Sequence, residues 1–303
     1  MSLKAAYVTL LTRVSYLAGT LVLDESLKET KSKYPLVVMV TPELPQEAQD
    51  VLVKRGIPTR DILSLRPEEG VHDLAAADAR FADTWTKLRA FELSEFDRVV
   101  LLDSDMIVKG NIDDLMEVKL PPGGIAAAHV CACNPRKFAH YPADWIPENC
   151  AFTAVPNPTA SPPTPREQPR PYSQLNSGTV VLEPSLDLAK ELYHFLATDE
   201  RVATFSFPDQ DLLSVFFLGK WTALPWYYNA LRTLRTIHAP LWDDSVARCV
   251  HYILADKPWT SRESVDFAVV NSWWWAQYDR MSEKLRAEDV DGWKLVSATV
   301  APA

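Results

Sequence analysis

Short apolar runs alternate with amphipathic segments along the first third of the chain, and this alternation constrains the fold more than any other feature of the sequence. Apolar runs of about four to eight residues predict strands, whereas apolar residues at helical spacing, with charges on the opposite face, predict helices. The predicted order is strand 5–11, helix 16–33, strand 34–42, helix 45–57, helix 84–95 and strand 98–105. Strands that alternate with helices pair in parallel and are covered on both faces. We therefore expect an α/β fold with a mainly parallel central sheet flanked by helices.

The pattern is less regular in the second half of the chain. The remaining predicted elements are strands 123–130 and 177–184 and helices 187–198 and 209–219. Between them, residues 156–171 are so rich in proline that they can form neither a helix nor a central strand. A long loop is favoured over a domain linker, because the residues that follow contain no new series of strand–helix–strand units.

Composition excludes several classes of protein. The 303 residues are 47% hydrophobic, which suffices for a sizeable core, and the formal net charge of −9 argues against nucleic acid as the main partner. The N-terminal segment is interrupted by polar residues and resembles no convincing signal peptide, and no apolar run is long enough to cross a membrane. Four irregularly spaced cysteines do not form a disulfide framework. We expect a soluble, cytoplasmic protein without a membrane span; its assembly state is left open, with a homodimer as one option.

Two smaller features are given structural interpretations. Cys131, Cys133 and Cys150 could suggest zinc, but no fourth ligand stands at a convincing spacing, so the sequence disfavours a zinc site. The tryptophans 273–275 could stack on a carbohydrate, but a C-terminal helix that buries them against the sheet is the favoured interpretation.

Two acids, Asp103 and Asp105, follow the most apolar run of the chain. Open α/β sheets bind ligands at the carboxyl ends of their strands. At an extended strand end, residues i and i+2 point to the same side, so both carboxylates could reach one hard cation and leave room for phosphate oxygens. A D-x-D pattern alone is also common in solvated acidic loops, so it is the preceding strand that favours a metal site.

A second candidate segment is "HYILADKPW", which places His251 six residues before Lys257. Histidine is a metal ligand at neutral pH, and lysine is a point charge for phosphate. In isolation both would be interpreted as ordinary surface residues. Together with Asp103 and Asp105 they favour a metal that holds a diphosphate.

Five motifs, in order between about residues 5 and 260, resemble glycosyltransferase family 8, the group of glycogenin and galactinol synthase. They are "YVTLLTRVSYLAG", "TKLRAFELSEFDRVVLLDSDMIV", "LNSGTVVLEPS", "PDQDLLSVFF" and "HYILADKPW". The resemblance implies a Rossmann-like domain of the GT-A type over residues 1–265, with the proline-rich loop inside it and a helical extension over 266–303. It also implies a retaining hexosyltransferase with a UDP-sugar donor and a manganese ion.

The resemblance assigns roles residue by residue. Asp103, Asp105 and His251 would hold the manganese ion. The implied donor-binding residues are Thr12, Tyr16, Lys87, Asp103, Ser104, Asn176, Ser177, Gly178 and Lys257. Among these, Thr12 and Tyr16 would flank the uridine, Lys87 would lie over the phosphate or sugar, and Lys257 would neutralise the diphosphate. Asn176, Ser177 and Gly178 would line the sugar pocket, with Asp209 and Gln210 opposite.

The implied catalytic residues are Asp209, Gln210 and Lys87. Asp209 could assist the sugar cation or the acceptor, and the Gln210 amide could sit behind the anomeric carbon. An ordinary helix-capping role for Asp209, after Pro208, is the structural alternative. We assign no protein nucleophile.

The acceptor is the least constrained part of the prediction. Residues 229–250, where glycogenin carries its own acceptor tyrosine, contain no tyrosine, whereas "KSKYPLVVMVTPELP", "HVCACNPRK" and "RTLRTIHAPLWDD" resemble galactinol synthase segments. Galactinol synthases transfer galactose from UDP-galactose to myo-inositol, so we favour a small polyol or glycan acceptor. The alternatives are a glycogenin-like self-glucosylating primer and a catalytically silent protein that binds UDP-sugars.

Overall fold

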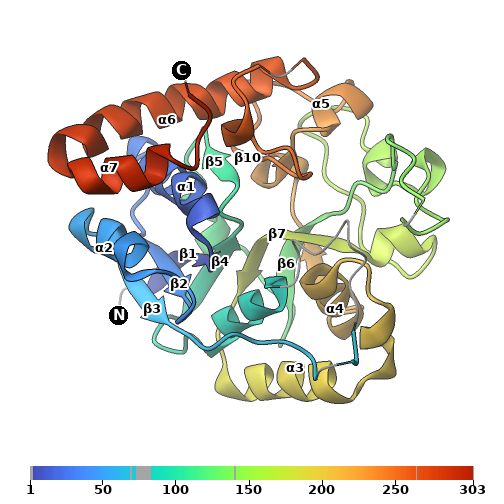
Figure 1. The fold of residues 1–303 in the computed structure, drawn as a ribbon. Coiled ribbons are helices and arrows are strands. Elements are labelled where there is room, and N and C mark those ends of the chain that lie inside the picture. Colours follow the sequence, from blue (N-terminus) through green and yellow to red (C-terminus); the bar gives the residue numbers. More distant parts are fainter. Residues whose placement is uncertain (1–2, 69, 73–82, 140, 264, 303) are drawn as a thin grey trace.

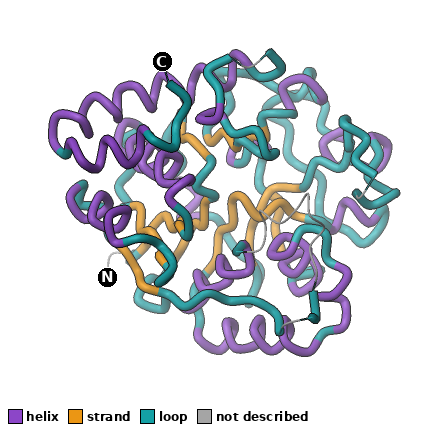
Figure 2. Tube along the Cα trace, viewed as in Figure 1, coloured by secondary structure: helices purple, strands orange, loops and turns teal. Residues whose placement is uncertain are grey.

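The computed structural model describes residues 3–68, 70–72, 83–139, 141–263 and 265–302. Strands gather at the centre, helices surround them, and long loops form one side of the molecule (Figures 1 and 2). The strands of the central sheet are β1 (Ala5–Leu11), β2 (Leu36–Val40), β3 (Thr59–Asp61), β4 (Arg98–Leu102), β6 (Ile125–His129), β7 (Leu175–Leu182) and β8 (Trp221–Ala223). Their order is β3-β2-β1-β4-β7-β6-β8.

The sheet is mainly parallel, as predicted. Strands β3, β2, β1 and β4 pair in parallel, and so do β6 and β8. Strand β7 is antiparallel to both of its neighbours, β4 and β6. Its first residues therefore lie at the same edge of the sheet as the carboxyl ends of β1 and β4.

The helices cover both faces of this sheet (Figure 1). The α-helices are α1 (Leu17–Glu29), α2 (Gln46–Lys54), α3 (Leu186–Thr198), α4 (Pro208–Phe216), α5 (Leu234–Ile237), α6 (Ala268–Glu288) and α7 (Val290–Ser297). Successive strand residues alternate between two cores: Tyr7 and Val100 pack with α1, α2, α6 and α7, whereas Val8 and Leu101 pack with α3 and α4. This period of two is what a strand covered on both faces requires.

Several sequence predictions differ from the structure, and strands β3 and β8 of the central sheet were not predicted. The segment predicted as helix 84–95 is a 3₁₀ helix, η3 (Thr84–Glu92), and the predicted helix 16–33 ends at Glu29. The strand predicted over 98–105 ends at Leu102, so Asp103 and Asp105 lie in a turn and not on an extended strand end.

A second, smaller sheet was not predicted. It consists of β5 (Met106–Val108), β10 (Cys249–His251) and β9 (Ala230–Leu231), in the order β5-β10-β9. Such short strands carry almost no periodic signal, and they exist because each finds a partner in the folded chain. This sheet holds β10 against the turn that follows β4.

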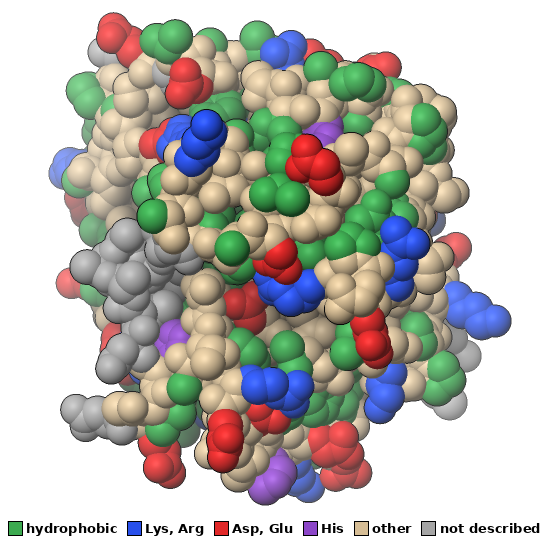
Figure 3. Space-filling view, turned by 90° about the vertical axis from the view of Figure 1, so that its right-hand side faces the viewer, with side chains coloured by type: hydrophobic (Ala, Val, Ile, Leu, Met, Phe, Trp, Pro, Cys, Tyr) green, Lys and Arg blue, Asp and Glu red, His purple; other side chains and the backbone are tan. Residues whose placement is uncertain are grey.

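The C-terminal helices pack on the main body. Helix α6 lies over α1, and α7 lies beside α2 (Figure 1). Trp274 and Trp275 of α6 are buried, as predicted, while Trp273 is half-buried with the Lys109 ammonium 3.3 Å from its ring centre. Within the described residues, no helix combines the length and the apolar character needed to cross a membrane. On the face drawn in Figure 3, acidic and basic side chains are interspersed.

Candidate active site

A cavity of about 480 Å³ opens at the sheet edge where β1 and β4 end and β7 begins. All of the residues predicted to bind metal, donor or sugar, apart from Gly178, line it. Gly178, on β7, lies against the ring of His251, which lines the cavity. The structure thus brings the dispersed motifs together at one place.

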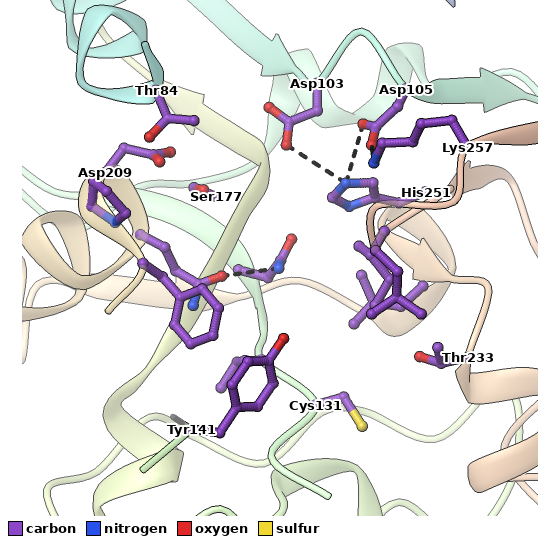
Figure 4. Close-up of a pocket in the computed structure, with 18 of the residues that line it drawn as sticks. Thr84, Asp103, Asp105, Cys131, Tyr141, Ser177, Asp209, Thr233, His251 and Lys257 are labelled. Carbon is purple, nitrogen blue, oxygen red and sulfur yellow. Dashed lines mark hydrogen bonds and ion pairs between the residues drawn. The ribbon is translucent and has the colours of Figure 1, made fainter. Parts of the chain in front are cut away.

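Asp103, Asp105 and His251 converge in this cavity (Figure 4). The Nε2 atom of His251 lies 3.5 Å from Asp103 Oδ2 and 3.3 Å from Asp105 Oδ1, and one ligand atom from each residue lies within 4.8 Å of the others. The small sheet explains the convergence, because β10 pairs with β5 so that His251 faces Met106, the residue after Asp105. Two carboxylates and an imidazole at this separation fit a divalent cation.

The tautomer of His251 is fixed by Asn229. The Nδ1 atom of His251 lies 2.8 Å from Asn229 Oδ1, which can only accept a hydrogen bond. Nδ1 must therefore carry the hydrogen, and in the neutral ring Nε2 presents its lone pair to the two carboxylates. This is the arrangement that prepares a histidine for metal coordination.

A chain of amide hydrogen bonds continues from Asn229 to the predicted sugar pocket. Asn229 Nδ2 donates to Asn176 Oδ1 over 2.7 Å, and Asn176 Nδ2 donates to Gln210 Oε1 over 3.0 Å. The orientation of each amide fixes the next, so Gln210 Nε2 is free to meet a substrate. Among the described residues that buried nitrogen has no hydrogen-bond partner.

Gly178 lies directly against the imidazole of His251. A Cβ atom added at Gly178 would overlap the ring at its Cε1 and Nδ1 atoms. Only glycine leaves room for the ring on this strand, which gives a physical reason for the glycine of the "NSG" motif.

Lys257 places a positive charge beside the candidate metal ligand Asp105. Its ammonium donates to Asp105 and, over 2.9 Å, to the carbonyl oxygen of Tyr252. Burial opposes ionisation of Asp105, but the pKa of that carboxyl is held well below its usual value, chiefly by the charge of the Lys257 ammonium. Asp105 is therefore ionised and ready to bind a cation.

Lys87 joins the predicted metal and sugar regions. Its Nζ atom lies 2.9 Å from Asp103 Oδ1, 3.3 Å from Ser177 Oγ and 2.6 Å from Asp209 Oδ2. Burial lowers the pKa of Lys87, yet the two carboxylates raise it above its usual value overall, so the side chain is a cation. In the structure, Lys87 forms ion pairs with Asp103 and Asp209, and it lines the wall of the cavity.

The helix-capping alternative for Asp209 is not what the structure has. The backbone amides of Ser206 and Phe207, at the start of α4, each donate to Asp211 over 2.9 Å. Asp209 instead turns toward Lys87 inside the cavity. Burial raises the pKa of Asp211 to about 6, which marks it as a buried structural acid.

The two walls of the cavity differ in character; we call the wall with the predicted uridine-binding residues Thr12 and Tyr16 the donor side, and the wall opposite it the acceptor side. On the donor side, Thr12 Oγ1 donates to Asp83 over 3.2 Å, and Tyr16 meets the edge of Trp259 with ring centres 5.4 Å apart. The opposite wall is aromatic, because Tyr141, Trp145 and Phe207 lie with ring centres 5.1–5.3 Å apart. Aromatic faces next to polar groups suit a sugar or polyol.

A fourth candidate metal ligand was missed by the sequence analysis. His238 Nε2 lies 3.7 Å from Cys131 Sγ, 3.2 Å from Cys133 Sγ and 3.6 Å from Cys150 Sγ. The three cysteines and this histidine form a cluster of their own beside the cavity. The sequence analysis missed His238 because it lies 88–107 positions away from the cysteines along the chain.

The fold is of the GT-A type found in glycosyltransferases. Two solved structures share the fold: LgtC, described as a galactosyltransferase with donor and acceptor sugar analogues, and the glycosyltransferase GlyE of Streptococcus pneumoniae. LgtC aligns with a TM-score of 0.65 at 15% identity, over 93% of this chain and 99% of its own. GlyE aligns with a TM-score of 0.60 at 18% identity, over 99% of this chain and 66% of its own.

The sequence comparison narrows the class. The chain belongs to glycosyl transferase family 8, whose family model matches residues 7–263. It is 30% identical to galactinol synthase 3 of Arabidopsis thaliana over 290 residues, which cover 91% of this chain and 81% of the relative. It is also 29% identical to galactinol synthase 1 of Solanum lycopersicum, over 97% of this chain and 89% of the relative.

Proposed function

We propose that the chain is a metal-dependent hexosyltransferase that moves a sugar from UDP-hexose to a small polyol or glycan, with retention of anomeric configuration. The similarity to galactinol synthases favours UDP-galactose as donor and a polyol such as myo-inositol as acceptor. The observation that carries the proposal is the convergence of Asp103, Asp105 and the Nε2 atom of His251 in one cavity, with Nδ1 of the ring held by Asn229. The cytoplasmic location and the homodimer stay predictions from the sequence.

The residues present fit a manganese ion. Both carboxylates are ionisable oxygen ligands, and Asn229 leaves only the Nε2 lone pair of His251 available. Asp103, Asp105 and His251 would hold the ion, and when bound it would supply positive charge to the diphosphate of the departing UDP.

The protein's own groups act around that ion. Lys257, beside Asp105, places a positive charge where negative charge grows on the leaving diphosphate. Lys87 holds the Asp209 carboxylate toward the cavity, and the amide chain from Asn229 orients Gln210. Asp209 is therefore positioned to stabilise positive charge on the sugar, and the Gln210 Nε2 group is positioned to donate to a hydroxyl oxygen of the sugar or the acceptor.

A self-glucosylating activity is less well supported. Tyr228, next to the stretch in which glycogenin carries its acceptor, is buried and donates to Asp114 over 2.6 Å. Tyr16 and Tyr141 line the cavity, however, and would be the candidate acceptors in such a reaction. Intact mass after incubation with UDP-glucose and manganese would reveal added hexoses.

A UDP-release assay tests the proposal. UDP-glucose, UDP-galactose and UDP-N-acetylglucosamine would each be supplied with manganese, with and without myo-inositol. We expect the fastest release with UDP-galactose and myo-inositol together, and its loss when the metal is chelated. Absence of turnover with all three donors, under conditions where the folded protein binds UDP, would support the catalytically silent alternative and contradict the proposal.

A further inference from the structure

We propose that Cys131, Cys133, Cys150 and His238 form a structural zinc site, separate from the metal site of Asp103, Asp105 and His251. One potential ligand atom from each of the four residues lies within 4.8 Å of the others. All four cysteines of the chain, including the distant Cys249, are free thiols in the structure. The inference does not depend on the proposed transferase activity.

The geometry matches a tetrahedral zinc centre. With Zn–S bonds of about 2.3 Å and Zn–N bonds of about 2.0–2.1 Å, sulfur and nitrogen ligands stand about 3.6 Å apart. The three observed separations between Cys Sγ and His238 Nε2 are 3.7, 3.2 and 3.6 Å. Three sulfurs therefore surround one ring nitrogen at the spacing that a shared ion imposes.

The ligands come from three separate segments of the chain. Cys131 and Cys133 follow β6, Cys150 ends the 3₁₀ turn Pro147–Asn149, and His238 follows α5. The ring of His238 also meets Phe152, with ring centres 6.0 Å apart, which helps to fix its orientation. Three loops are thus brought to one point with little regular structure to hold them.

The chemistry of the ligands indicates zinc. Three thiolates and one imidazole form the Cys₃His set of closed structural zinc sites, whereas manganese and magnesium prefer oxygen ligands. Cys133, Cys150 and His238 are buried, and Cys131 is half-buried. A fourth protein ligand leaves no open position for a substrate, so the expected role is structural.

The site would stabilise the acceptor-side wall of the cavity. Cys131 lines the cavity on the side away from Asp103 and Asp105 (Figure 4). The wall residues Phe138, Tyr141 and Trp145 lie between Cys133 and Cys150, so the ion would close a loop that carries them. Cross-linking the ends of a loop restricts the unfolded chain and holds the loop in place.

Metal analysis of the reduced 303-residue chain, purified without a histidine tag, is the first test. After mild chelation that strips exposed metal, we expect about one zinc per chain, and cobalt substitution should give thiolate-to-cobalt absorption. Cys133→Ser and His238→Gln should each reduce zinc content at least about tenfold. Cys249→Ala and Asp105→Ala are the matched controls and should keep their zinc.

A second readout covers the case in which a ligand variant fails to fold. In the wild type, loss of zinc should speed trypsin cleavage at the exposed Arg136 and Lys137 by about tenfold or more, because both residues lie in the loop between Cys133 and Cys150. Folded, reduced wild type without zinc or thiolate–cobalt absorption, or Cys133→Ser with wild-type zinc content, would overturn the inference. So would a disulfide between any two of these cysteines in the freshly purified protein.

Discussion

The Nδ1 atom of His251 and the Oδ1 atom of Asn229 lie 2.8 Å apart in a buried hydrogen bond. Because the oxygen can only accept, this contact decides which ring nitrogen of His251 faces the two acids. Asn229 thus orients a ligand of the proposed metal site without itself lying next to the ion.

Removal of this acceptor should weaken metal binding. Asn229→Leu keeps the approximate volume but leaves Nδ1–H without its partner, and the loss of such an outer contact typically costs about 10–100-fold in metal affinity. Asn229→Asp keeps an acceptor and should recover most of that loss. Manganese titration in the presence of UDP, followed by electron paramagnetic resonance, measures both; equal affinity of Asn229→Leu and wild type would refute this role.

Gly178→Ala should disturb the same histidine by a different route. The added methyl group would overlap the imidazole, so the ring must leave its present position beside Asp103 and Asp105. We expect about a tenfold or greater loss of manganese affinity, of the size that follows loss of an orienting contact. Gly110→Ala is the control, because its Cβ would meet Arg248 at an ordinary 3.5 Å. Similar losses in both variants would show that the effect is not specific to His251.

Lys87→Met should destabilise the fold as well as the site. The change leaves two carboxylates, Asp103 and the buried Asp209, without their shared cation, and breaking a buried pair costs about 3–5 kcal/mol. Lys190→Met removes an exposed pair with Asp187 and should leave stability close to that of the wild type. Urea unfolding compares the two variants, and an unchanged midpoint for Lys87→Met would contradict the bridging role.

Asp211 should make stability depend on pH. Burial raises its pKa from 3.8 to about 6, so the folded state holds this proton more tightly than the unfolded state does. Its contribution is present in full below pH 3.8 and is lost as the pH rises through about 6, a change of about 2–3 kcal/mol. Asp211→Asn should therefore raise the melting temperature more at pH 7.5 than at pH 4.5. An equal shift at both pH values would show that Asp211 is ionised throughout.

The sequence predicts those parts of the fold and site that local patterns encode. The apolar runs of β1, β2 and β4 and the helical spacing of α3 gave the layered sheet, and the "DSD" and "HYILADKPW" segments marked the acids, His251 and Lys257. The family resemblance supplied the roles of the remaining pocket residues.

Features created only by tertiary pairing were missed. Strand β10 has three residues and exists through its pairing with β5, and η3 differs from a regular helix in geometry that composition does not encode. His238 joins Cys150 across 88 positions of the chain, and Asn229 reaches His251 across 22. No spacing rule connects residues that meet only when separate loops fold together.

Binding of manganese and UDP by the folded protein tests the central claim most directly. Calorimetric titration should show one manganese per UDP-bound wild-type chain, with affinity lost in Asp105→Ala and His251→Ala, and UDP-hexose turnover should disappear with it. Lys257→Ala should still bind the metal but weaken UDP most. Wild-type manganese affinity and full turnover in Asp105→Ala would show that the metal-binding assignment is wrong.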